Sequence, residues 1–327
     1  MIVYDYSKRL IFVAMNSCSE IQEFPEEPAV LQHVKSSCYC SLELMMVNKI
    51  NPLEPDVGLN IPSIGFGTML FPEPEKAVDL ISYAIDVGYR HIDTARKYGS
   101  EAWVGEALAN ASVKREDIWV TTKVTEENAK ADDFASSVEL SLRTLKLDYV
   151  DLLLIHWPQP NVPLQETVNA LIKAKRDGLA KNIGISNFTV ELIHKAAKLS
   201  SEPLYTNQVE YHPYINQDKV LTACRQYGIS VTCHVPLARG KVLTDPVIAK
   251  IGKFHNKSPA QITLRWLIQQ ENIIAVPRGL SKQEIIENIN VYDFTLSNKE
   301  MDEISGLRKK NLRLVDPEVR RPLWDIP

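Results

Sequence analysis

The sequence predicts an α/β fold of the (β/α)8, or TIM barrel, class, because short β-rich runs alternate with helical patterns from about residue 61 onward. Eight strand candidates occur, which is enough to close a barrel of parallel strands. Helical patterns between them carry single apolar stripes that would cover a sheet, such as Ala77, Ile81, Ala84 and Ile85. The expected strands are 63–68, 90–94, 118–123, 150–157, 182–187, 205–210, 230–235 and 273–278.

The first expected strand argues against a doubly wound alternative. A dinucleotide-binding fold of that type needs the pattern G-x-G-x-x-G after its first strand. Residues 65–70 read Gly-Phe-Gly-Thr-Met-Leu and lack the third glycine. The phosphate-binding pattern G-x-x-x-x-G-K-[ST] does not occur in the sequence. The barrel is therefore the preferred class.

Residues with special backbone roles mark the ends of the expected helices. Gly88, Gly178 and Gly228 each follow a helical pattern and precede a strand candidate, as a left-handed glycine after a helix does. Helix starts show the S-x-x-E/Q capping signature, and Pro259 occupies a permissive first helical position. The capping pairs are Ser258 with Gln261, Ser281 with Glu284, and Ser297 with Glu300.

Composition narrows the classes of partner. The 327 residues include 37 Lys and Arg against 41 Asp and Glu, a net charge of -4, which argues against a nucleic-acid partner. No apolar run approaches the roughly 18 residues of a membrane span. Five cysteines without a CxxC pair favour reduced thiols and a cytoplasmic location. A small-molecule partner is expected.

The chain divides at about residue 55. Residues 1–55 carry three of the cysteines and no sustained periodicity, so we interpret them as a poorly ordered N-terminal extension. Residues 56–327 contain all the strand candidates and form the expected barrel.

Several expected strands begin apolar and finish with polar residues. Barrel active sites lie at the carboxyl ends of the strands, so these polar side chains should line one mouth. They are Asp93, Lys123, His156, Ser186, Asn187 and Gln208.

These side chains suggest proton-transfer chemistry. Lys123 and Asp93 can form a partly buried ion pair, and Tyr98 lies on the loop that follows Asp93. A phenol titrates near pH ~10, and a nearby ammonium favours its anion by roughly 4 kcal/mol at an effective dielectric of about 20, so we expect a lowered pKa for Tyr98. His156 could hold the same substrate oxygen by a hydrogen bond.

Five motifs together resemble the aldo-keto reductase family, over about residues 56–327. Within it, the late region is most similar to bacterial 2,5-didehydrogluconate reductases, which also reduce methylglyoxal and other small aldehydes. The motifs are Asp93-Thr94-Ala95 with Tyr98, Thr121-Thr122-Lys123, His156-Trp157-Pro158, Gly-Ile-Ser-Asn-Phe at 184–188, and Asn-Gln-Val-Glu at 207–210.

The resemblance implies reduction of a small carbonyl substrate with NADPH, or with NADH as the alternative cofactor. Tyr98 would be the general acid, tuned by Lys123 and Asp93, with His156 orienting the carbonyl. Trp157 and Phe66 would wall the substrate pocket. A monomer is the implied oligomeric state. Implied cofactor contacts are Thr68, Ser186, Asn187, Gln208, His234, Pro236, Leu237, Arg278 and Asn288.

The sequence departs from the family pattern at both ends of the implied cofactor site. His234 occupies the place where the family usually has a tyrosine under the nicotinamide ring. Arg278 fits the basic residue that reaches a 2′-phosphate, but Glu284 falls where many members have a second arginine. The His234 difference predicts an altered cofactor affinity and pH dependence, because an imidazole stacks with less area and can carry charge. The Glu284 difference weakens the expected preference for NADPH.

Two other readings compete with the reductase. A zinc hydrolase on the same fold would need more ligands, and no H-x-H or H-E-x-x-H pattern occurs among the seven histidines. No metal site is therefore expected. A cofactor-binding accessory or sensor barrel with faded catalysis is the other alternative, since a fold alone does not secure activity.

Overall fold

The computed structural model describes residues 61–71 and 73–326 of the chain. The expected N-terminal extension, residues 1–55, lies outside the described residues, as does its boundary with the barrel.

Eight parallel strands form one sheet whose order follows the chain from β1 to β8. Each strand pairs in parallel with the next, which confirms all eight strand predictions and the fold class. The strands are β1 (Phe66–Gly67), β2 (His91–Asp93), β3 (Trp119–Val124), β4 (Val150–Ile155), β5 (Ala180–Ser186), β6 (Leu204–Glu210), β7 (Ser230–His234) and β8 (Ile273–Ala275).

The sheet closes between its first and last strands. Ile64, just before β1, forms a parallel bridge with Ala275 of β8. Gly65 N donates to Ala275 O at 2.8 Å, and Ala275 N donates to Ser63 O at 2.8 Å. A doubly wound sheet has two free edges, so this closure rules that alternative out.

The two glycines at β1 have a packing role. A Cβ on Gly65 would lie 2.4 Å from the Nδ1 atom of His91, and one on Gly67 would lie 2.7 Å from the carbonyl oxygen of Val276. The G-x-G pattern therefore permits neighbouring strands to approach β1 closely.

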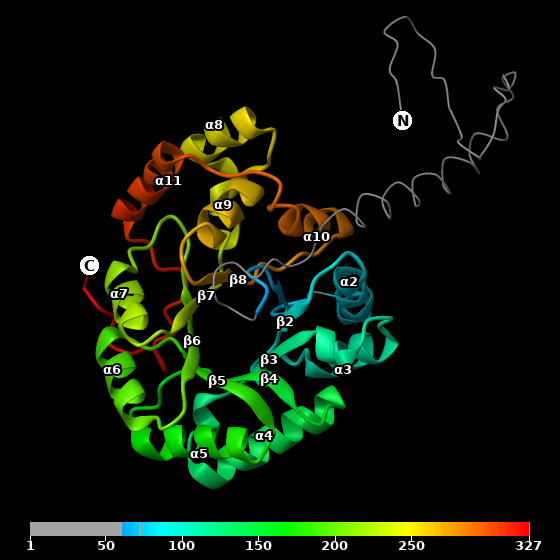
Figure 1. The fold of residues 1–327 in the computed structure, drawn as a ribbon, viewed down its shortest axis with the longest axis vertical. Helices are drawn as coiled ribbons and strands as arrows, with labels where there is room; N and C mark the ends of the chain where they lie inside the picture. The colour runs from blue at the N-terminus through cyan, green and yellow to red at the C-terminus, as the bar shows by residue number, and fades with distance from the viewer. Residues whose placement is uncertain (1–60, 72, 327) are drawn as a thin grey trace, which may run out of the picture. The chain divides into compact units, whose positions relative to one another are not determined.

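Helices surround the strands, as Figure 1 shows. Most of them follow a strand and return the chain to the start of the next one, which is the connection that parallel pairing requires. The helices are α2 (Pro74–Asp86), α3 (Glu101–Asn110), α4 (Ala131–Leu145), α5 (Leu164–Arg176), α6 (Val190–Leu199), α7 (Asp218–Gln226), α8 (Pro246–His255), α9 (Pro259–Ile268), α10 (Lys282–Ile289) and α11 (Asn298–Ser305). Short 3-10 helices include η1 (Arg96–Tyr98) and η3 (Glu126–Asn128).

The predicted helix ends are largely confirmed. Gly88, Gly178 and Gly228 have φ values of 111°, 78° and 66°, which a residue with a Cβ adopts only with strain. Full capping boxes start α9 and α11, at Ser258 and Ser297. At α10 the Ser281 hydroxyl accepts from Glu284 N, but the Glu284 carboxylate accepts from Leu280 N instead of completing the box.

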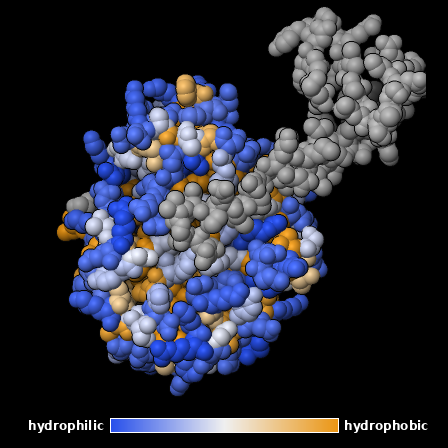
Figure 2. Space-filling view, viewed as in Figure 1, coloured by the Kyte–Doolittle hydropathy of each residue, from blue (hydrophilic) through white to orange (hydrophobic). Residues whose placement is uncertain are grey.

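The core consists mainly of aliphatic side chains on the strands and on the inner faces of the helices. All six residues of β4 are buried, as expected for a parallel strand covered on both faces. The face seen in Figure 2 is mainly hydrophilic, with apolar side chains in smaller groups. Among the described residues, no helix is both long and apolar enough to cross a membrane.

Candidate active site

The centre of the site is a buried ion pair. Lys123 Nζ donates to Asp93 Oδ1 at 2.7 Å and to the carbonyl oxygen of Thr94 at 2.7 Å. Lys123 is fully buried and Asp93 is 3% exposed. Both lie at the ends of neighbouring strands, β2 and β3, so the predicted pairing is confirmed. Burial makes this a strong electrostatic contact, because little water screens it.

Tyr98 lies beside this pair at the end of η1. A left-handed residue, Gly99, follows it and ends the 3-10 turn. The Lys123 ammonium lies 5.0 Å from the centroid of the Tyr98 ring, and its charge acts to lower the pKa of the phenol. The ring of His156 meets the Tyr98 ring edge to face at 5.6 Å. The structure therefore brings the phenol, ammonium, carboxylate and imidazole together.

The expected lowering of the Tyr98 pKa is wrong in direction. Burial raises the pKa of the phenol above its usual value of 10.0, and this effect exceeds the opposing influence of the Lys123 charge. The same surroundings act on His156, because burial and the Lys123 charge hold its pKa well below 6.5. The phenol thus retains its proton and the imidazole is neutral at pH 7.

Three amide and hydroxyl side chains continue the network around the barrel mouth. Gln208 Nε2 donates to Asp93 Oδ2 at 2.7 Å, and Ser186 Oγ donates to the Gln208 carbonyl oxygen at 2.8 Å. Asn187 has a φ of 61° and donates from Nδ2 to the His156 carbonyl oxygen at 2.9 Å. These residues end β5 and lie in β6, so the predicted convergence of strand ends is confirmed.

His234 extends the network from β7. Its Nε2 atom lies 3.0 Å from Asn187 Oδ1, so this nitrogen carries the proton and donates. Burial lowers the pKa of His234 to about 4. The imidazole is therefore neutral at pH 7. At the position where the family usually has a tyrosine, this chain thus places an uncharged ring beside the Asn187 amide.

Neutral burial of histidines has a consequence for stability. The pKa values of His91, His156 and His234 all lie below 6.5, so below pH 6.5 the unfolded chain binds more protons at these sites than the native one. We expect the free energy of unfolding to fall as pH drops from about 6.5 towards 4, measured by urea denaturation. His234→Tyr should make the decline shallower, and an unchanged slope would contradict neutral burial of His234.

The two predicted substrate-wall residues have different surroundings. Trp157 follows His156, is 3% exposed, and packs against Trp324 with ring centroids 6.1 Å apart. Phe66 has no exposed surface and packs against the rings of Phe71 and Tyr89. The role of Phe66 in the substrate wall stays a prediction.

The remaining cofactor candidates lie at the β1 and β8 ends of the mouth. Thr68 is fully buried, and its hydroxyl contacts the Asp93 carbonyl oxygen and Ser100. Arg278 is exposed and donates from Nη1 to the carbonyl oxygens of Met69 and Leu70. Asn288 Nδ2 donates to the Arg278 carbonyl oxygen at 3.4 Å.

Pro236 is buried after β7, and Leu237 beside it is partly exposed. As cofactor contacts, Pro236, Leu237 and the candidates at the β1 and β8 ends stay predictions.

Sequence reasoning missed the residues that hold the C-terminal segment, residues 311–326, against the barrel. The Glu210 carboxylate at the end of β6 accepts from the backbone N–H groups of Leu314 at 2.6 Å and Val315 at 2.8 Å. Arg320 contacts Glu126 and lies over Trp157. The polar end of β6 was visible in the sequence, but contacts across more than 100 residues leave no local pattern that pairs it with this segment.

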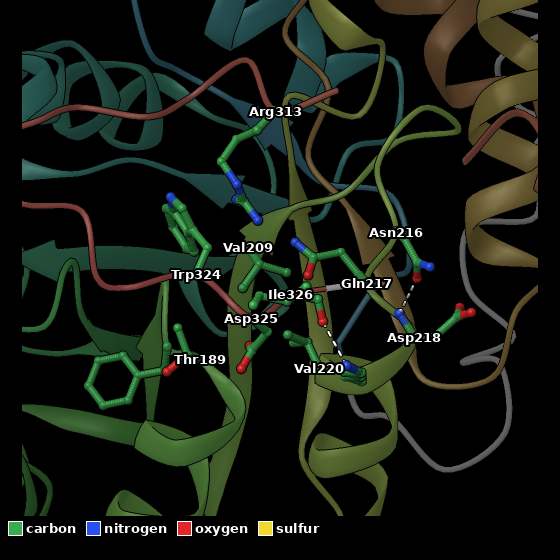
Figure 3. Close-up of a pocket in the computed structure, with 12 residues that line it drawn as sticks. Thr189, Val209, Asn216, Gln217, Asp218, Val220, Arg313, Trp324, Asp325 and Ile326 are labelled. Atoms are coloured by element: carbon green, nitrogen blue, oxygen red, sulfur yellow. Dashed lines mark hydrogen bonds between the residues drawn. The ribbon is translucent and has the colours of Figure 1, made fainter. Parts of the chain in front are cut away.

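A cavity of about 190 Å³ lies beneath the C-terminal segment, between the first turns of α6 and α7. Figure 3 shows Arg313 and Trp324 on one side of it, and the Arg313 guanidinium lies 3.7 Å from the Trp324 ring centroid. None of the four catalytic candidates lines this cavity. Among the described residues, no group of three or more His, Cys, Asp or Glu side chains could hold a metal ion.

The protein combines a closed barrel of parallel strands with a cluster of polar, titratable side chains at the strand ends. These two features define it as a barrel enzyme with a site for proton transfer. The chain belongs to the aldo-keto reductase family, whose family model matches residues 63–309. It is an oxidoreductase that reduces carbonyl compounds with a nicotinamide cofactor.

Proteins similar to this chain are named as reductases of small carbonyl compounds or as aldo-keto reductases. Methylglyoxal reductase DkgB of Escherichia coli O157:H7 is 40% identical over 268 residues, covering 81% of this chain and 99% of the relative. A solved structure named as a candidate 2,5-diketo-D-gluconic acid reductase B is 43% identical with a TM-score of 0.79, covering 82% and 95% of the two chains. A Bombyx mori aldo-keto reductase in complex with NADP is 32% identical with a TM-score of 0.74, covering 81% and 94%.

Proposed function

We propose that this protein is a monomeric NADPH-dependent reductase of small aldehydes and keto-sugars, such as methylglyoxal and 2,5-didehydrogluconate, with Tyr98 as the proton donor. One observation carries the proposal: Tyr98, Lys123 and His156 meet at the mouth of the barrel, with Asp93 paired to the lysine. The names of the most similar relatives support the substrate class.

The residues present fit a nicotinamide. Its carboxamide needs both donors and acceptors, and Ser186, Asn187 and Gln208 supply both kinds within one hydrogen-bonded group. His234 adds an uncharged aromatic ring beside Asn187. These four residues would hold the nicotinamide end of the cofactor. When bound, the reduced cofactor supplies the hydride for the carbonyl carbon.

The protein supplies the proton and the orientation. The Tyr98 phenol is protonated at pH 7 and can donate to a carbonyl oxygen as negative charge develops there. Lys123 stabilises the phenolate that remains, and Asp93 holds the ammonium in place. The neutral His156 imidazole can donate a hydrogen bond to the same oxygen, which orients the carbonyl towards Tyr98.

Cofactor choice depends on Arg278 and Glu284. Arg278 is the predicted ligand of the 2′-phosphate, and two solved relatives contain NADP or NADPH, which supports NADPH. The Glu284 carboxylate at the start of α10 opposes a 2′-phosphate, so we expect NADH to be accepted as well.

Arg278→Ala should weaken NADPH binding about tenfold to hundredfold, because charge-assisted hydrogen bonds are lost, and should affect NADH much less. Glu284→Arg should have the opposite effect and strengthen NADPH binding. The measurement is a cofactor titration followed by protein fluorescence. Equal effects of Arg278→Ala on both cofactors would remove the reason for preferring NADPH.

The proposal is tested by adding methylglyoxal to the protein with NADPH and following the loss of reduced-nicotinamide absorbance. Continuous consumption that depends on protein and substrate is the expected result. Cofactor binding without consumption, across a panel of aldehydes and keto-sugars, would favour the accessory or sensor barrel instead.

A further inference from the structure

Three buried hydroxyl groups lie next to the turn that carries Tyr98. Ser100 Oγ lies 2.9 Å from Thr68 Oγ1 and 2.9 Å from Thr94 Oγ1. Thr68 Oγ1 in turn donates to the Asp93 carbonyl oxygen at 3.0 Å. None of the three hydroxyl-bearing residues has exposed surface. We call Thr68, Thr94 and Ser100 the hydroxyl cluster.

The donor of each hydrogen bond in the hydroxyl cluster follows from a count of protons. A hydroxyl has one proton to donate, and a carbonyl oxygen only accepts. The Thr68 proton goes to the Asp93 carbonyl oxygen. Ser100 must therefore donate to Thr68, and Thr94 must donate to Ser100. Removal of the Ser100 hydroxyl would break two of the three hydrogen bonds in this chain.

The Ser100 hydroxyl does not have the usual role of a serine at its position. Ser100 is the N-cap residue of α3, where a serine side chain usually accepts from a backbone N–H of the first turn. The Ser100 side chain makes no such hydrogen bond. Its hydroxyl contacts instead Thr68, which follows β1, and Thr94, which follows β2. The contacts of Ser100 therefore relate it to the strand ends at the barrel mouth.

The hydroxyl cluster also closes the turn that contains Tyr98. Thr94 and Ser100 lie on either side of residues 95–99, and their hydrogen bond joins the two ends of this turn. The Thr94 carbonyl oxygen accepts from Lys123 Nζ at 2.7 Å. Thr94 thus binds both the ammonium group and the far end of the turn. The hydrogen bond between Thr94 and Ser100 therefore fixes the position of the Tyr98 ring relative to Lys123.

We propose that Ser100 is a positioning residue for the reaction, because its hydroxyl closes the turn that holds Tyr98 next to Lys123. The assignment rests on the proposed reductase function, with Tyr98 as the proton donor. Ser100 acts through Tyr98, since its own hydroxyl is buried between two threonines. Proton transfer depends on such placement, because a shift of about 1 Å in a reacting group can lower a rate on the order of hundredfold.

The experiment measures methylglyoxal reduction with NADPH in two variants that break the same hydrogen bond. Ser100→Ala removes its acceptor, and Thr94→Val removes its donor while keeping a side chain of similar shape. Each variant should lower kcat about tenfold to hundredfold. Cofactor affinity should change little, because Thr68 keeps its hydrogen bond to the Asp93 carbonyl oxygen.

Two further variants serve as controls. Thr94→Ser retains the hydroxyl and should keep most of the wild-type kcat. Ser230→Ala removes another buried serine hydroxyl, which donates to the Tyr205 carbonyl oxygen at 2.8 Å at the start of β7. This strand end is opposite the mouth, so Ser230→Ala should leave kcat near the wild-type value.

A double variant separates positioning from stability. Ser100→Ala leaves the Thr94 hydroxyl buried without its acceptor, whereas Ser100→Ala combined with Thr94→Val removes both groups. The double variant should therefore unfold at a higher urea concentration than Ser100→Ala. Its kcat should stay as low as that of either single variant, because all three lack the same hydrogen bond.

The solvent isotope effect reports on the proton transfer itself. The ratio of kcat in H2O to kcat in D2O should be larger in Ser100→Ala than in the wild type, because a displaced acid makes proton transfer slower relative to the other steps. A smaller amount of folded protein would lower kcat equally in both solvents and leave this ratio unchanged.

Three outcomes would overturn the assignment. Wild-type kcat in Ser100→Ala would remove the role of Ser100 and leave the reductase function intact. Recovery of kcat together with stability in the double variant, or an unchanged solvent isotope effect in Ser100→Ala, would make Ser100 a support for the fold alone. If the wild-type protein consumed no cofactor with any aldehyde, the proposed function would be lost as well.

Discussion

Tyr98→Phe is expected to lower kcat for methylglyoxal reduction by about 10²–10⁴-fold, the range for loss of a general acid. The phenylalanine keeps the ring that packs against His156 but has no proton to donate to the carbonyl oxygen. The amide group that would hold the nicotinamide is separate from Tyr98, so cofactor affinity should stay close to that of the wild type. Steady-state kinetics together with a cofactor titration measure both quantities.

A tyrosine outside the site serves as the control. Tyr149 precedes β4, at the strand end opposite the mouth, and contacts Lys181 and Arg115. Tyr149→Phe should leave kcat near the wild-type value. If Tyr98→Phe weakened cofactor binding as much as it lowered kcat, Tyr98 would be a cofactor contact and its role as the acid would be contradicted.

Lys123→Met is expected to lower the free energy of unfolding by about 3–5 kcal/mol, because Asp93 would remain buried without its cation. It should also abolish most turnover, since the phenolate of Tyr98 would lose its stabilising charge. Urea denaturation and steady-state kinetics measure the two effects. The partly exposed ion pair of Lys97 offers a control, and Lys97→Met should cost about 1 kcal/mol or less.

A double variant distinguishes the two effects of Lys123. Lys123→Met combined with Asp93→Leu removes both charges, and a buried ion pair replaced by apolar groups often regains stability. The free energy of unfolding should recover only in part, because the Gln208 amide loses its acceptor on Asp93. Turnover should stay low. If Lys123→Met alone lowered the free energy of unfolding as little as Lys97→Met does, the Lys123–Asp93 pair would have to be well hydrated. That result would contradict its burial.

The barrel and the meeting of its catalytic candidates could be predicted because both follow from local patterns and one topological rule. Strands such as 118–123 end in polar residues, and parallel strands deliver their ends to one face. Lys123 and Asp93 therefore had to be neighbours, whatever the details of packing. Helix ends at Gly88 and Ser258 were equally local, since each depends on the backbone of a few residues.

The remaining features depend on burial and on distant contacts. The pKa of Tyr98 rises because the surrounding chain removes water, which residue spacing does not reveal. Phe66 is buried against the rings of Phe71 and Tyr89, a contact that the short strand β1 does not reveal in the sequence. Arg320 contacts Glu126 across the barrel mouth, at a sequence separation of 194 residues.

The most direct test of the proposed chemistry follows the hydrogen atom that the reaction transfers. Methylglyoxal is incubated with the protein and NADPH carrying deuterium at its transferable position, and the product alcohol is analysed by mass spectrometry. We predict one deuterium on the former carbonyl carbon for the wild type, and at most a trace for Tyr98→Phe. Bound cofactor with no labelled alcohol from the wild-type protein would contradict the reductase function.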